Sequence, residues 1–79
     1  MKNVRVQFDL SEERASEIQD LMDKCGINTR KELFNYALTI LEWAVEESEN
    51  GLDIAAINRA EKEFYALRMP ILSKVKSNK

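Results

Sequence analysis

The residues best suited to chemistry near the start of the chain are the polar members of VRVQFDL, residues 4–10. Arg5, Gln7 and Asp9 alternate there with apolar residues, which is the period of a strand with one buried face. The polar side chains then share the other face. An arginine, a glutamine and a carboxylate can hydrogen-bond to guanine, adenine and cytosine in a major groove, whereas the simpler reading is a solvated strand face.

A second group of chemically useful residues lies in GINTRKEL, residues 26–33. Thr29 and Glu32 have the capping-box spacing that starts a helix. Free backbone N–H groups, the positive end of the helix dipole and the adjacent bases Arg30 and Lys31 together favour an anion. The alternative is an ordinary capped helix start with exposed bases.

The remaining composition argues against catalysis. The chain has no histidine, and Cys25 is its one cysteine, so the usual general base and the usual metal-ligand sets are missing. We interpret Cys25 as a small buried apolar residue near a helix end. The acids of residues 12–23 are interpreted as the solvated face of a helix. We therefore expect no enzyme, no cofactor and no metal site.

Length and charge limit the classes further. With 79 residues, one chain can hardly enclose a sufficient core, so oligomerisation is expected. Residues 11–50 hold four bases against ten acids, whereas residues 51–79 hold six bases against three acids. A bulk basic field is therefore missing, and any nucleic-acid binding must come from a local surface. No signal peptide or membrane span is evident, which predicts a cytoplasmic protein without a membrane partner.

Two helices are predicted next. Ser11 is a natural N-cap for a helix that ends at Gly26, and Thr29 starts a second helix over about residues 31–48. The second helix is apolar nearly all round, so a second copy of the same helix is its expected cover. One plausible seam for that contact is Leu33, Ala37, Leu41 and Ala44. The neighbouring stripe Tyr36, Ile40 and Trp43 is either further core or a docking surface.

The chain past Asn50-Gly51 is organised differently. Residues 52–57 are a short strand or an apolar loop, and Asn58 caps a third helix to about Met69. Pro70 then breaks the helix, and the basic tail, residues 73–79 with Lys74, Lys76 and Lys79, frays. We expect a dimerisation and DNA-binding domain at residues 1–50 and an extension at residues 51–79.

A lone strand leaves its backbone unpaired, so the strand at residues 4–10 needs a partner. If two chains pair these strands antiparallel, one face of the ribbon packs on the four helices through its apolar side chains, Val4, Val6, Phe8 and Leu10. The opposite face carries the polar residues twice. A two-stranded ribbon of this width fits the major groove of B-DNA.

With these features, VRVQFDLSEE and GINTRKEL resemble the ribbon-helix-helix family, the MetJ/Arc/CopG-like DNA-binding proteins. The resemblance covers roughly residues 3–50. It implies a mostly α fold, an intertwined homodimer with a ribbon-helix-helix core, to which this chain adds a C-terminal short strand or loop and helix. It further implies that the bases are contacted by Arg5, Gln7 and Asp9, and the phosphates by Asn28, Thr29, Arg30 and Lys31.

The expected function is a sequence-specific DNA-binding homodimer that represses transcription, with two dimers side by side on double-stranded DNA. The alternative is an antitoxin whose C-terminal segment binds a toxin protein through Phe64, Tyr65, Leu67 and Met69. A third hypothesis is a helical dimer that has lost DNA binding. Asp9 matters to the choice, because its carboxylate repels phosphates unless it meets a cytosine or caps the first helix together with Glu12.

Overall fold

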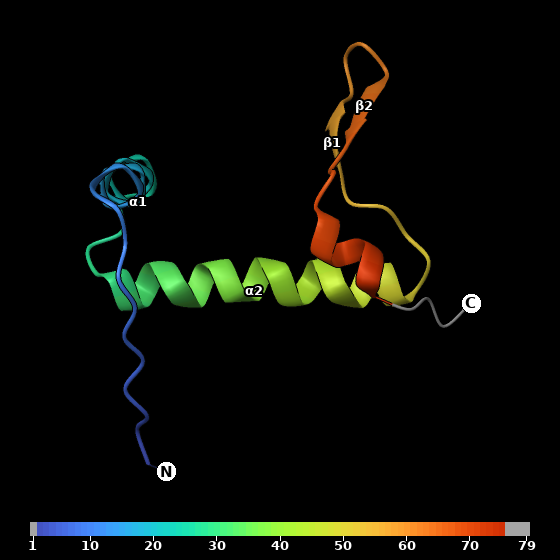
Figure 1. The fold of residues 1–79 in the computed structure, drawn as a ribbon. Helices are drawn as coiled ribbons and strands as arrows, with labels where there is room; N and C mark the ends of the chain where they lie inside the picture. The colour runs from blue at the N-terminus through green and yellow to red at the C-terminus, as the bar shows by residue number, and fades with distance from the viewer. Residues whose placement is uncertain (1, 76–79) are drawn as a thin grey trace. The chain divides into compact units, whose positions relative to one another are not determined.

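The protein forms two helices, then a two-stranded antiparallel sheet and a short 3-10 helix, in a computed structural model that describes residues 2–75 (Figure 1). In chain order the elements are α1 (Glu12–Cys25), α2 (Arg30–Glu49), β1 (Ala55–Asn58), β2 (Glu63–Ala66) and η1 (Pro70–Lys74). Contacts divide the chain into two compact units, Met1–Phe34 and Asn35–Lys79. The domain boundary predicted at residue 50 stays a prediction.

α1 starts and ends where flanking residues satisfy its backbone. The Ser11 hydroxyl accepts a hydrogen bond from the Arg14 N–H at 3.1 Å, which covers one of the free donors of the first turn. At the other end Gly26 has a φ of 67°, and its N–H donates to the Asp23 carbonyl at 3.3 Å. Glycine adopts this left-handed conformation more readily than any other residue. The first predicted helix and both of its ends are confirmed.

α2 confirms the second predicted helix. The Thr29 hydroxyl accepts a hydrogen bond from the Glu32 N–H at 3.1 Å, as a cap should. The helix has 20 residues, which at 1.5 Å each gives a length of about 30 Å. It ends at the predicted stop, where the Gly51 N–H donates to the Ser48 carbonyl at 3.0 Å.

The expected ribbon-helix-helix fold is wrong for the described residues, because the strands follow the helices instead of preceding them. Residues 2–11 form neither strand nor helix. A strand requires a neighbour that hydrogen-bonds its backbone, and within residues 2–75 the strand pairing recorded is the one between β1 and β2. The alternation in VRVQFDL specifies which side would be buried, but it does not supply a partner.

The predicted third helix over residues 58–69 is also wrong, and a β-hairpin stands there. β1 and β2 pair so that Ile57 faces Phe64 and Ala56 faces Tyr65. Large β-branched and aromatic residues favour such cross-strand pairs over a helix. Asn58 does act as a cap, but of a turn, since its side-chain oxygen accepts a hydrogen bond from the Glu61 N–H at 3.3 Å.

Residues 52–57 were predicted to be either a short strand or an apolar loop. The structure has both, because residues 52–54 are irregular and β1 begins at Ala55. The hairpin turn closes through Lys62, whose φ of 56° is left-handed. After β2, Pro70 occupies the first turn of the short 3-10 helix η1, where its missing N–H costs nothing. Lys76 and Lys79 of the predicted frayed tail lie outside the described residues.

A core is nearly missing from the described residues. Met22 in α1 and Ala44 in α2 are the buried apolar side chains there, with exposed fractions of 4% and 5%. The prediction that Cys25 is buried is wrong, because it is exposed at the last residue of α1. None of the described helices has the length and apolar character that a membrane crossing requires.

Candidate nucleic-acid interface

The first part of the candidate site is the N-terminal segment, residues 2–11, which runs into α1 within the unit Met1–Phe34 (Figure 1). Arg5, Gln7 and Asp9 are all exposed there. Hydrogen bonds and ion pairs recorded within residues 2–75 involve none of these three side chains, so their polar atoms are available to a ligand.

The apolar residues of the same segment are also uncovered. Val4 has 85% of its surface exposed and Val6 has 70%, and Phe8 and Leu10 are exposed as well. At about 25 cal/mol per Å² of apolar surface, this is an unfavourable arrangement for an isolated chain. The predicted packing of these four side chains in a dimer core is not tested by a single chain.

The second part of the site is the start of α2. Asn28, Thr29, Arg30 and Lys31 are exposed, as a contact with a phosphate requires. The first four N–H groups of a helix lack partners inside the helix. Among them, the Glu32 N–H donates a hydrogen bond to the Thr29 hydroxyl. The remaining donors, the helix dipole and two bases favour an anion, while the Glu32 carboxylate opposes it.

The two parts belong to one contact unit but are not joined by any hydrogen bond or ion pair recorded for residues 2–75. The ion pair described in this range joins Arg14 and Glu17 at 3.5 Å, on the exposed surface of α1. Arg5, Arg30 and Lys31 are therefore not neutralised by a carboxylate there. This leaves two separate cationic patches, with Asp9 as the acidic neighbour of the first.

The other residues predicted for the dimer seam lie on α2. Ala44 is buried, Leu33 and Leu41 are half-buried, and Ala37 is exposed. The neighbouring stripe remains uncovered, since Tyr36, Ile40 and Trp43 expose about half of their surface or more. α2 therefore keeps apolar surface on two sides.

The residues predicted for toxin binding are placed on or just after β2. Phe64, Tyr65, Leu67 and Met69 are all exposed. Tyr65 is the one among them with a polar contact, because its hydroxyl donates a hydrogen bond to a Glu63 carboxylate oxygen at 2.5 Å. That hydrogen bond, and to a smaller extent desolvation, raises the pKa of Tyr65 above its usual value.

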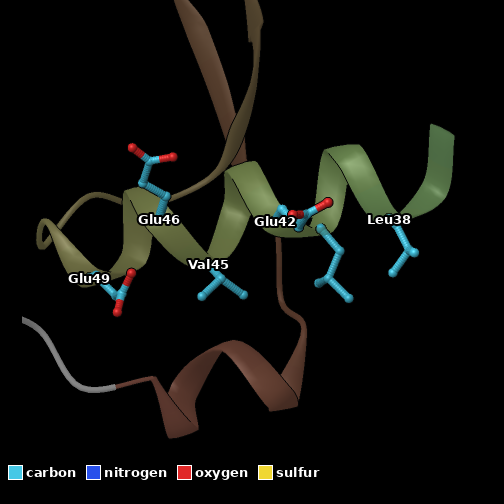
Figure 2. A pocket seen from close by; sticks show the side chains of 6 residues that line it. Leu38, Glu42, Val45, Glu46 and Glu49 are labelled. Carbon is cyan, nitrogen blue, oxygen red and sulfur yellow. The ribbon is translucent and has the colours of Figure 1, made fainter. Parts of the chain in front are cut away.

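One surface was missed by the sequence interpretation. Along α2, an open groove of about 660 Å³ is lined by apolar and acidic side chains, Leu38, Leu41, Glu42, Val45, Glu46 and Glu49 (Figure 2). The sequence signal was present, because both the apolar and the acidic members recur at spacings of three and four residues. The predicted seam shares Leu41 with this groove, whereas Leu38 and Val45 belong neither to the seam nor to the neighbouring stripe.

Metal binding finds no support in the part of the chain that the structure describes, where histidine, cysteine and acidic side chains form no group suited to hold an ion. The geometry therefore offers binding surfaces: an exposed polar segment, a helix start with two bases, a hairpin and a groove.

No protein-family model, curated protein or solved structure shows a significant match to this chain.

Proposed function

We propose that this protein binds double-stranded DNA as a homodimer in the cytoplasm and regulates transcription, most simply as a repressor. The observation that carries the proposal is the exposure, within one contact unit, of Arg5 and Gln7 on the N-terminal segment and of Arg30 and Lys31 at the start of α2. This is a binding activity, and no catalytic step is proposed. The resemblance to the ribbon-helix-helix family supports the residue roles but not the fold.

The proposed contacts divide into two kinds. Arg5 and Gln7 supply the forked donors and the amide that discriminate guanine and adenine in the major groove, and Asp9 accepts from cytosine. Asn28, Thr29, Arg30 and Lys31 hold a phosphate through side chains and backbone N–H groups, which positions the protein without reading sequence.

The proposal includes a second copy because a single chain leaves too much apolar surface in water. Only Met22 and Ala44 are buried in the described part of the chain, and a domain of this size needs a larger core. A dimer brings two copies of each cationic patch to one DNA site. Two dimers binding side by side would raise affinity further through effective concentration.

The experiment is a selection of bound sequences from genomic DNA with the purified protein, followed by fluorescence anisotropy at stated salt. Arg5→Ala and Gln7→Ala should each weaken binding to the selected site by roughly tenfold and relax the preference at one base pair. Arg14→Ala is the matched control, since Arg14 is an exposed base on α1 engaged with Glu17. Unchanged affinity and preference in both test variants would refute the proposed base contacts.

A second candidate function is an antitoxin that binds a toxin protein with its C-terminal segment, residues 51–79. The specific observation in its favour is the hairpin, which exposes Phe64 by 73% and Tyr65 by 63%. Exposed aromatic residues are typical anchors of protein interfaces. Coexpression with the protein encoded by the neighbouring reading frame tests it. Copurification that is lost in Phe64→Ser supports the antitoxin, and no copurification counts against it.

A further inference from the structure

The groove along α2 combines apolar and acidic side chains. Its apolar members are Leu38, Leu41 and Val45, and Leu38 and Val45 project from the same side of the helix in Figure 2. Its acidic members are Glu42, Glu46 and Glu49, which are exposed. A ligand that fits this surface must bring apolar side chains flanked by positive charge.

The charge of the groove is unbalanced within its own helix. Residues 36–49 contain four glutamates and no base. The ion pair recorded for the described residues lies on α1, so none of the groove carboxylates has a basic partner there. Like charges three and four residues apart on one helix repel each other, and a basic ligand would relieve this repulsion.

The complementary chemistry occurs in the same chain, after β2. From residue 64 to the end, the sequence has four bases and no acid. In the described part of this stretch, Arg68 and Lys74 supply the charge, and Met69 and Ile71 supply exposed apolar surface. We call residues 67–75 the basic segment.

The basic segment has two faces. Leu72 and Val75 are half-buried and line a hollow of about 450 Å³ together with Ser48 at the end of α2. Ile71 and Lys74 are exposed and do not line this hollow. Because side chains three residues apart eclipse in a 3-10 helix, Ile71 and Lys74 share one side of η1. The inner face is therefore engaged within its own chain, and the outer face is not.

We propose that the groove of α2 binds the outer face of the basic segment of a second copy, and that the two copies exchange this contact reciprocally. The occupant is a second copy because the basic segment already uses its inner face on its own chain, while the groove is lined by α2 residues alone. In this contact the apolar side chains of the groove meet Ile71, and its carboxylates meet Lys74. The inference rests on the homodimer of the proposed function and adds a contact outside the DNA-binding surface.

The test is a charge exchange between two full-length variants. The groove variant carries Glu42→Lys, Glu46→Lys and Glu49→Lys, which keeps good helix formers on an exposed helix face. The segment variant carries Lys74→Glu, which lies on the outer face. A control variant with Glu17→Lys, Asp20→Lys and Glu61→Lys matches the charge change of the groove variant at exposed sites elsewhere.

Sedimentation equilibrium at low salt measures the dimer dissociation constant of each protein. Each of the two test variants should dimerise about tenfold more weakly than the control variant, because like charges face each other in the exchanged contact. An equimolar mixture should form a heterodimer, identified by native mass spectrometry, within about threefold of wild-type affinity. High salt should reduce all of these differences.

Three outcomes would overturn the inference. Test variants that dimerise as the control does would show that the groove holds no part of a second copy. A mixture that is not restored, while a chain carrying all four substitutions is, would show that the groove binds its own segment. A wild-type protein that is monomeric at its highest soluble concentration would exclude a second copy altogether.

Failure of this inference can be separated from failure of the proposed function, because the substituted residues lie outside the candidate DNA interface. The same samples are titrated with DNA. If charge exchange succeeds without DNA binding, the exchanged contact stands and the DNA proposal falls. If a dimer binds DNA but charge exchange has no effect on dimerisation, the DNA proposal stands and the exchanged contact falls.

Discussion

Thr29 and Glu32 are joined at the start of α2 by a hydrogen bond of 3.1 Å, in which the Glu32 N–H donates to the Thr29 hydroxyl. The contact fixes the first turn of the helix, the same turn that carries Arg30 and Lys31. A helix start whose remaining donors and two bases face solvent is suited to a phosphate. The stability of α2 and the proposed phosphate contact would therefore depend on the same residue.

Thr29→Ala is expected to lower the free energy of unfolding by about 1 kcal/mol and to weaken DNA binding, because it removes the cap beside the bases. Thr29→Ser should retain both properties. Ser11→Ala removes the equivalent cap of α1 and should cost similar stability without weakening DNA binding. Urea denaturation at equal chain concentration and fluorescence anisotropy measure the two effects. An equal loss of DNA affinity in Ser11→Ala would show that Thr29 acts through stability alone.

Gly26→Ala should lower the free energy of unfolding by about 1 kcal/mol. The cause is the backbone, because Gly26 has a φ of 67° and a Cβ added there would meet no atom within 4 Å. Gly26→Asn is the control, since asparagine tolerates this conformation better than alanine. Urea denaturation followed by circular dichroism at 222 nm measures the free energy of unfolding, which should decrease from the wild type to Gly26→Asn and then to Gly26→Ala. An alanine variant as stable as the wild type would contradict the argument.

The helices could be predicted because their signals are local. Ser11, Gly26 and Thr29 each act on a backbone group within about four residues, so no knowledge of distant contacts is needed. The candidate contact residues Arg5, Gln7, Arg30 and Lys31 were likewise readable as exposed polar positions. The ligand of these residues could not be predicted, because an exposed polar side chain can equally be in contact with water alone.

The strand predictions failed because a strand forms only where a neighbour pairs with it, and alternation alone does not specify that neighbour. VRVQFDL has the alternation of a strand without a neighbour among the described residues, and it forms none there. Residues 55–58 pair with residues 63–66, although Ala60, Phe64 and Leu67 also have helical spacing. Short apolar runs fit both periods, and the cross-strand pair of Ile57 with Phe64 decides between them.

Asp9→Asn distinguishes the roles left open for this carboxylate. If Asp9 accepts a hydrogen bond from cytosine, the substitution should change the preferred base at one position by roughly tenfold, as for other direct contacts. If it only repels phosphates, affinity should rise for all sequences alike. A binding selection repeated with the variant measures this. Asp20→Asn on the exposed face of α1 is the control for a lost negative charge.

The hydrogen bond between Tyr65 and Glu63 makes a prediction about pH. The Glu63 carboxylate raises the pKa of Tyr65 above 10.0, so the folded hairpin holds this proton more tightly than the unfolded chain does. The stabilising contribution is therefore fully present below the unfolded pKa and is lost as pH rises through the folded pKa. In a Tyr36→Phe background, Tyr65 is the remaining tyrosine of the two.

Ultraviolet titration of tyrosinate in that background measures the pKa of Tyr65 directly. Glu63→Ala should lower the midpoint, because it removes both the acceptor and the negative charge. Glu61→Ala is the matched control, since Glu61 lies two residues away in the hairpin turn and its side chain makes no recorded contact with Tyr65 among the described residues. A midpoint that moves equally in both variants would indicate a general charge effect of the turn, whereas a shift confined to Glu63→Ala would confirm that the hydrogen bond between Glu63 and Tyr65 on one face of β2 exists in solution.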